Sequence, residues 1–223
     1  MPEPSSPSPD YLSRYLQKWE GLENYRLQEQ SLSLLFKEFC PLNSVLEQVL
    51  LKVSALNDFY STNIFDTYSV AKHILGMKID SRLSSGDLSL VNELAMVTIR
   101  DKKRNFYSFA SKYCSHHFPD TYPIFDSYFE RMLLHYARAD SFSSFRKEHL
   151  RHYESFVRII REFQAFYRLG QFTLRQIDIF LWLAGKDSFL PKYAGGITLK
   201  KRKNAGKNGV EKMGSDTINF MLG

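Results

Sequence analysis

The chain has 223 residues, of which 43% are hydrophobic, so it is long enough for one globular unit or for two small domains. Thirty basic and twenty-four acidic residues give a formal net charge of +6, which favours a polyanionic partner such as nucleic acid or an anionic membrane surface. Cys40 and Cys114 form neither a zinc-finger pair nor a disulfide framework. The N-terminus lacks the regions of a signal peptide, and no apolar run is long enough to span a bilayer. We therefore expect a soluble, cytoplasmic protein without a membrane partner.

Helical periodicity extends through most of the chain and predicts an all-α fold. A Pro/Ser-rich arm over residues 1–9 is expected to be disordered, and residues 10–192 are expected to form the helical domain. Helical stripes are found from Tyr11 to Trp19, from Ser31 to Phe39 and from Leu46 to Val53. Few segments alternate with a period of two, so any sheet should be small or absent.

The middle of the chain, about residues 88–137, predicts a pair of helices followed by a loop and a further helix. Leu88–Val97 is the first predicted helix. The second has a buried stripe and ends before Pro119; the stripe consists of Phe106, Phe109, Ala110, Tyr113, Cys114 and His117. Beyond the loop, Ser127 and Glu130 fit a capping box, so Asp126 is not required as the cap of the next helix.

The last third of the sequence predicts two more helices and a basic tail. One long helix should run from Phe145 to Leu169 with Gly170 as its stop, and Leu174–Ala184 should follow a second capping box. Residues 193–223 contain a cluster of basic residues at 200–203 and no apolar stripe, which predicts a flexible tail. Such a tail either contacts phosphates nonspecifically or is simply a solvated terminus.

The segment Ser108–Leu133 resembles the helix-hairpin-helix DNA glycosylase superfamily, and most of all its 8-oxoguanine glycosylases of the archaeal type. The family's pattern is matched without a gap by Ala110, Ser111, Ile124, Asp126 and Arg131. Near the C-terminus, Ile177–Trp182 followed by Gly185-Lys186 resembles the Leu-Asp-x-x-x-Trp…Gly-Lys pattern that closes the same fold, although the Trp-to-Gly spacing is shorter.

The resemblance implies a two-lobed helical fold and a base-excision activity. The enzyme would cleave the N-glycosidic bond of a damaged or modified base that is flipped out of double-stranded DNA. Asp126 would stabilise the positive charge that develops on the sugar, with no metal or cofactor. The imine-forming lysine of the bifunctional members would fall at Ser108, which cannot form an imine, so we expect a monofunctional, hydrolytic enzyme. Lys112 lies one helical turn further and is the second candidate catalytic residue.

The same resemblance indicates where DNA should bind. The stretch 98–105 lacks the glycines of the family's hairpin, but it carries Lys102, Lys103, Arg104 and Asn105, which we expect to contact phosphates. Asn57, in the loop after an apolar helix, and Arg131 are the other predicted DNA-binding residues, and the protein is expected to act as a monomer. Candidates for an aromatic wall around the flipped base are Phe59, Tyr60, Tyr122, Phe125, Tyr128 and Trp182.

Two other functions remain open on the sequence. The missing glycines and Ser108 also fit a glycosylase-like scaffold without chemistry that serves as a DNA-binding or interaction module. Alternatively, Arg146 and His152 resemble the motif of the all-helical HEPN ribonucleases, although Lys147 departs from it. A zinc site built on Cys114 and the following histidines is disfavoured, because helical neighbours point about 100° apart.

Overall fold

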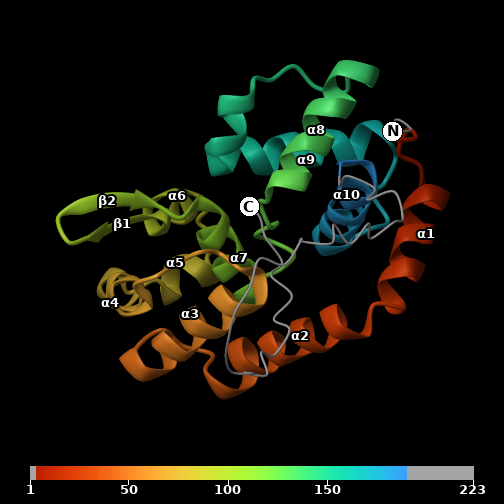
Figure 1. The fold of residues 1–223 in the computed structure, drawn as a ribbon. Helices are drawn as coiled ribbons and strands as arrows, with labels where there is room; N and C mark the ends of the chain where they lie inside the picture. Colours follow the sequence, from red (N-terminus) through yellow and green to blue (C-terminus); the bar gives the residue numbers. More distant parts are fainter. Residues whose placement is uncertain (1–3, 190–223) are drawn as a thin grey trace, which may run out of the picture.

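The computed structural model describes residues 4–189, and this part of the chain is mostly helical (Figure 1). The elements in chain order are α1 (Pro9–Glu20), α2 (Glu23–Leu34), the π-helix η1 (Leu35–Phe39), α3 (Leu46–Tyr60), α4 (Thr67–Met77), α5 (Asp80–Ser84), α6 (Ser89–Ala95), β1 (Met96–Ile99), β2 (Lys102–Asn105), α7 (Tyr107–His117), α8 (Ser127–Asp140), the 3-10 helix η2 (Lys147–Arg151), α9 (Tyr153–Phe166) and α10 (Leu174–Phe189). The predicted all-α class is confirmed. The predicted basic tail at 193–223 lies outside the described residues. Within residues 4–189, no helix combines the length and apolar character that crossing a bilayer requires.

Helix α7 lies in the centre of the molecule and is buried on all its faces (Figure 1). The predicted apolar stripe is part of the core. The polar side chains between its members are buried as well, among them Ser111, Lys112 and His116. Helix α7 is therefore a central helix that carries polar groups into the interior, where each of them needs a partner.

Helices α8 and α10 approach each other closely at a glycine. A Cβ atom added to Gly185 would lie 2.8 Å from Cβ of Tyr128 and 3.2 Å from the Tyr128 carbonyl oxygen. Real Cβ atoms do not come this close, so the contact requires glycine at this position. It holds α10 against the first turn of α8, next to Asp126.

Substitution of Gly185 by Ala should lower the free energy of unfolding by about 1–3 kcal/mol, because the added methyl group forces the two helices apart. Gly76→Ala in α4 is the matched control, since a Cβ atom there meets nothing within 4 Å. The control should be neutral or slightly stabilising. Urea denaturation of both variants measures the difference, and equal midpoints would show that the α8–α10 contact is not tight.

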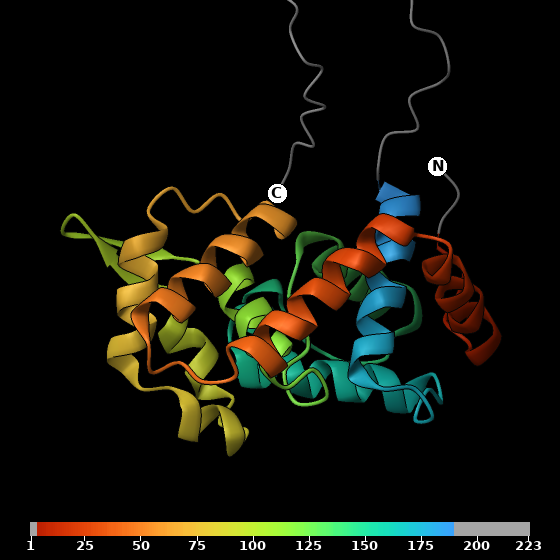
Figure 2. The ribbon, with the colours of Figure 1, turned by 90° about the horizontal axis from the view of Figure 1, so that it is seen from below.

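The N-terminal residues pack against the C-terminal half of the chain. Ser8 caps α1, and the hydroxyl of Tyr136 on α8 donates to the carbonyl oxygen of Ser5. On α1, the rings of Tyr11 and Tyr15 pack edge-on against Phe180 of α10. Residues 4–9 of the arm that we expected to be disordered therefore lie against the helical fold. Figure 2 shows α1 beside α10 from a second direction.

The region predicted as the end of one helix and a loop is an antiparallel β-hairpin. Met96 pairs with Asn105 and Ile99 with Lys102, so α6 ends at Ala95, two residues before the predicted end. Arg100 and Asp101 both have positive φ, at 46° and 62°, as a type I′ turn requires. The β-branched run from Val97 to Ile99 favours a strand over a helix and accounts for the difference.

The prediction of one long helix from Phe145 to Leu169 is wrong. The chain leaves the helical conformation at His152, which separates the 3-10 helix η2 from α9. Asn92 replaces the missing helical hydrogen bonds: its side chain donates to the carbonyl of Arg151 and accepts from the amide of Tyr153, both at 2.8 Å. Helix α9 then ends at Phe166. The left-handed residue beyond it is Arg168 rather than the predicted Gly170, and it is held there by a hydrogen bond from the Leu169 amide to the Gln164 carbonyl.

Candidate active site

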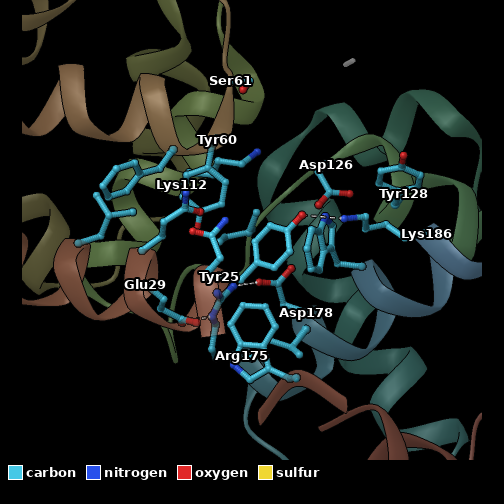
Figure 3. A pocket seen from close by; sticks show the side chains of 18 of the residues that line it. Tyr25, Glu29, Tyr60, Ser61, Lys112, Asp126, Tyr128, Arg175, Asp178 and Lys186 are labelled. Atoms are coloured by element: carbon cyan, nitrogen blue, oxygen red, sulfur yellow. Dashed lines mark hydrogen bonds and ion pairs between the residues drawn. The ribbon is translucent and has the colours of Figure 1, made fainter. Parts of the chain in front are cut away.

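A cavity of about 390 Å³ lies where α2, the end of α3, α7, the start of α8 and α10 meet (Figure 3). Its aromatic lining consists of Trp19, Tyr25, Phe59, Tyr60, Tyr128 and Trp182. Its charged lining consists of Glu29, Asp58, Lys112, Asp126, Arg175, Asp178 and Lys186. Concave sites with aromatic walls and a few converging polar groups are typical of ligand-binding sites. Four of the six aromatic residues named from the sequence line it, whereas Tyr122 and Phe125 are buried in the core.

Asp126 is the N-cap of α8, contrary to the prediction from the sequence. Its Oδ1 accepts a hydrogen bond of 2.8 Å from the backbone amide of Phe129. Glu130, predicted as the partner of Ser127 in a capping box, instead forms ion pairs with Lys147 and Arg151. Burial raises the pKa of Asp126, although Lys112 and the capping amides act in the opposite direction.

Lys112 points from α7 into the same cavity, and only 5% of the residue is exposed. Its amine donates to Oγ of Ser108 at 2.5 Å and to the carbonyl of Phe125 at 3.4 Å. Burial lowers the pKa of Lys112, although the charges of Asp126 and Asp178 raise it. A larger fraction of this amine is therefore neutral, and so nucleophilic, than of a solvated lysine.

Ser108 holds the amine of Lys112 in place. The Ser108 hydroxyl accepts from this amine and donates to the carbonyl of Phe125 at 3.0 Å. The sequence placed the imine-forming position of the resembling enzymes at Ser108 and placed Lys112 one turn away. In the structure the two side chains are hydrogen-bonded to each other. The amine of Lys112 therefore lies next to Ser108, the position at which the resembling enzymes carry their imine-forming lysine.

An ion cluster that the sequence did not predict lies in the cavity wall. The guanidinium of Arg175 donates to Glu29 at 2.7 Å and also to Asp178. Burial raises the pKa of Asp178 to about 7, despite the opposing effect of Arg175. Glu29 and Arg175 are 146 positions apart, so no local pattern links them. Asp178 is buried, pairs with Arg175 and also lines the cavity.

A lysine and two aromatic rings form another part of the wall. The amine of Lys186 lies 4.4 Å from the ring centroid of Trp182 and donates to the hydroxyl of Tyr25 at 3.1 Å. The rings of Tyr25 and Trp182 meet edge to face, with centroids 5.1 Å apart. Aromatic faces of this kind suit a flat, conjugated ligand.

The predicted DNA-binding residues lie outside the cavity. Lys102, Lys103, Arg104 and Asn105 form strand β2 and are all exposed. In both ribbon views the β-hairpin extends at the end of the molecule opposite α1 (Figures 1 and 2). Arg131 lies over the ring of Phe189, 5.9 Å from its centroid. The side chain of Asn57 braces the loop after α3 by hydrogen bonds with Thr62 and Ile64.

The residues of the other two motifs also lie apart from the cavity. Arg146 and His152 flank η2, and both are exposed. Cys114 is fully buried in the core, and the buried His116 accepts or donates a hydrogen bond of 3.1 Å with the hydroxyl of Tyr60. Among residues 4–189, no three His, Cys, Asp or Glu side chains converge closely enough to hold a metal ion.

Comparison with known proteins gives a family for the chain. The model of the HI_0787_N family, described as an N-terminal domain, matches residues 11–121. An uncharacterized protein of Haemophilus influenzae is 47% identical over 148 residues, which make up 66% of this chain and 71% of the relative. No solved structure matches the chain. The family segment extends from within the first turn of α1 to beyond the end of α7, so it includes Lys112 but ends before Asp126.

Proposed function

This chain belongs to the HI_0787_N family, and we propose that it excises a damaged or modified base from double-stranded DNA. One observation carries the proposal. The carboxylate of Asp126 and the amine of Lys112, from two different elements, line one aromatic cavity in which burial disfavours the charge of each. Strongly perturbed acid and base groups in a cleft are typical of catalytic sites. The aromatic walls would stack against a base that has left the duplex.

The chemistry follows from these two side chains. As the bond between the sugar and the base breaks, positive charge develops on the sugar ring, and Asp126 stabilises that charge. The base leaves with the bonding electron pair and takes up a proton. The neutral amine of Lys112 forms a bond to C1′ of the sugar and then loses a proton. The bond between C1′ and the ring oxygen then breaks, the ring oxygen takes up a proton, and the nitrogen loses its remaining proton as an imine forms between Nζ and C1′.

Water is the alternative acceptor of the sugar, and the hydrolytic reaction expected from the sequence stays a prediction. The observation that favours it is the hydrogen bond between Lys112 and Ser108. An amine engaged in this way can orient a water beside Asp126 instead of attacking the sugar itself. Both routes begin with the same loss of the base, and they differ in whether a covalent protein–DNA adduct forms.

We further propose that the helices form the two lobes of a helix-hairpin-helix glycosylase-like fold. The cavity supports this arrangement, because it is lined jointly by α2, α3 and α7 from the first part of the chain and by α8 and α10 from the second. Helices α6 and α7 would be the two helices of the motif, with the β-hairpin in place of the family's glycine-containing turn. Side chains of β2, rather than exposed backbone amides, would then contact the phosphates.

The activity is tested with duplexes that each carry one damaged or modified base, incubated with the full chain and then treated with alkali to cleave abasic sites. We expect cleavage at the modified position of at least one duplex and none with the Asp126→Asn variant. DNA binding without base release from any duplex would contradict the proposal and would favour a binding module instead.

Simultaneous replacement of Lys102, Lys103 and Arg104 by Ala should weaken DNA binding for all sequences. The slope of log K against log salt concentration should fall by about 2–3, because each lost phosphate contact removes roughly 0.9 from it. The matched control replaces Arg14, Arg138 and Arg161, which are also exposed and change the net charge equally. Fluorescence anisotropy at several salt concentrations gives both quantities. Equal slopes for the two triple variants would exclude β2 from the DNA interface.

A further inference from the structure

The backbone of Phe125, the residue before Asp126, is held by side chains of α7. Its amide donates to Oγ of Ser111 at 3.0 Å. Its carbonyl oxygen accepts from the hydroxyl of Ser108 at 3.0 Å and from the amine of Lys112 at 3.4 Å. Phe125 and Ser111 are both buried. Hydrogen bonds are strengthened where water is excluded, so these contacts fix both polar groups of the Phe125 backbone.

The two hydroxyl groups in this arrangement have one proton each, and each proton has a carbonyl partner. The Ser111 hydroxyl donates to the carbonyl oxygen of Ser108 at 2.9 Å. The Ser108 hydroxyl donates to Phe125, so its oxygen can only accept from the amine of Lys112, which lies 2.5 Å away. The Ser108 proton is therefore not available to the lone pair of a neutral lysine amine.

The amine of Lys112 thus meets two acceptors on the wall of the cavity, which are Oγ of Ser108 and the carbonyl oxygen of Phe125. A neutral amine has two N–H groups and one lone pair around its nitrogen. When both N–H groups bind these acceptors, the lone pair takes the remaining position, which points away from Ser108 and Phe125. Lys112 lines the cavity, and Figure 3 shows it below Tyr60 at one side of that space.

The charge of the amine is set by its wider surroundings. Burial lowers the pKa of Lys112, the carboxylates of Asp126 and Asp178 raise it, and Arg175 lowers it. Oγ of Ser108 favours the ammonium form, because an ammonium is a stronger donor than a neutral amine. Ser108 therefore reduces the neutral fraction of the amine, while it orients the fraction that is neutral. These two effects change a reaction of the amine in opposite directions.

We propose that Ser108 is a positioning residue, which turns the lone pair of the Lys112 amine away from the wall of the cavity and toward its interior. This role rests on the proposed function, because the lone pair has a target only when the sugar of a bound nucleotide lies in the cavity. The position at which the resembling enzymes carry their lysine would then direct a lysine supplied one turn later. In the hydrolytic reaction, the same lone pair would accept a hydrogen bond from the attacking water.

The first test needs no DNA. Formaldehyde with cyanoborohydride methylates neutral amines, and mass spectrometry gives the rate at Lys112 in the full chain at each pH. Ser108→Ala should move the pH of half-maximal rate down by about one unit, because the ammonium loses an acceptor. It should also lower the plateau rate at high pH by about threefold, because the amine can then adopt all three staggered orientations about the Cε–Nζ bond.

Two further variants make this test specific. Ser108→Thr keeps a hydroxyl and should restore both the midpoint and the plateau. Ser115→Ala removes another buried hydroxyl of α7 and is the matched control, which should change neither. An unchanged midpoint in Ser108→Ala would show that the hydrogen bond to Lys112 does not form. A lower midpoint with the wild-type plateau would show that Ser108 acts through charge alone. Either result would overturn the proposal.

The second test measures borohydride trapping with substrate DNA in single turnover, at a pH above both midpoints, where the amine is neutral in both proteins. Ser108→Ala should form the adduct about tenfold more slowly, with unchanged affinity for the duplex, because the lone pair is no longer aligned. An adduct that forms as fast as in the wild type, or faster, would overturn the proposal. If the wild type forms no adduct while the methylation results are as expected, attack of the amine on the sugar is rejected and the orientation of the amine by Ser108 is retained.

Discussion

Replacement of Asp126 by Asn should slow base release by about a hundredfold or more, since the variant loses the charge that stabilises the developing sugar cation. The fold should be retained, because Asn caps a helix about as well as Asp does, and the hydrogen bond to the Phe129 amide can still form. The loss is measured as the single-turnover rate of base release from a duplex that carries a modified base excised by the wild-type protein. Unfolding midpoints that match the wild type show that the loss is chemical.

Asp58→Asn is the matched control for this substitution. Asp58 lines the same cavity but is exposed at the end of α3, so its carboxylate is screened by water. Its variant should keep a rate close to that of the wild type. If folded Asp126→Asn retains most of the activity, Asp126 acts only as a helix cap, and the assignment of the cavity as a base-excision site fails.

Treatment of the wild-type protein with borohydride in the presence of substrate DNA should trap a covalent protein–DNA adduct, and Lys112→Gln should prevent it. The reason is that borohydride reduces an imine, and the amine of Lys112 lines the cavity together with Asp126 and is hydrogen-bonded to Ser108. Base release itself should also fall by on the order of a hundredfold. Denaturing gel electrophoresis separates the adduct from free DNA.

Lys186→Gln provides the control for the trapping experiment, because Lys186 also lines the cavity but packs on Trp182 and Tyr25. This variant should still form the adduct. If the wild type forms no adduct and leaves an intact abasic strand that breaks only in alkali, water is the acceptor. The hydrolytic reaction predicted from the sequence would then be correct, and the amine mechanism would be wrong.

The sequence located the two central side chains but not their environment. Helical spacing placed Lys112 one turn after Ser108, and the loop pattern placed Asp126 before α8, so local information was sufficient for both. The burial of Lys112 had no such signal, because polar side chains beside an apolar helical stripe normally indicate a solvent-facing side, whereas the structure buries those of α7 as well. Arg175 and Glu29 meet only through the tertiary fold. Their pairing therefore was not predictable from either segment.

Each error in the predicted elements arose at a place where two local sequence signals favoured different structures. Asp126 and Ser127 are both good N-caps, and the sequence alone favoured the second because Glu130 stood at the right distance. Glu130 bonds instead to cations from η2, which are distant in sequence. At Val97–Ile99, continued apolar spacing indicated a helix while β-branching indicated a strand, and the strand formed.

The position of α1 has a consequence for the order of folding. Its apolar side, with Leu12 at the centre, is covered by α10, and the side chains of Tyr15 and Asp187 that bond across this contact are 172 positions apart. The family segment therefore includes a helix whose partner lies beyond the end of the segment and is synthesised after it. During synthesis α1 leaves the ribosome well before α10, so its apolar surface stays uncovered until α10 has left the exit tunnel. Formation of this long-range contact should be a late event in folding. In a chain that ends after residue 121, the apolar surface of α1 has no α10 to cover it and stays exposed.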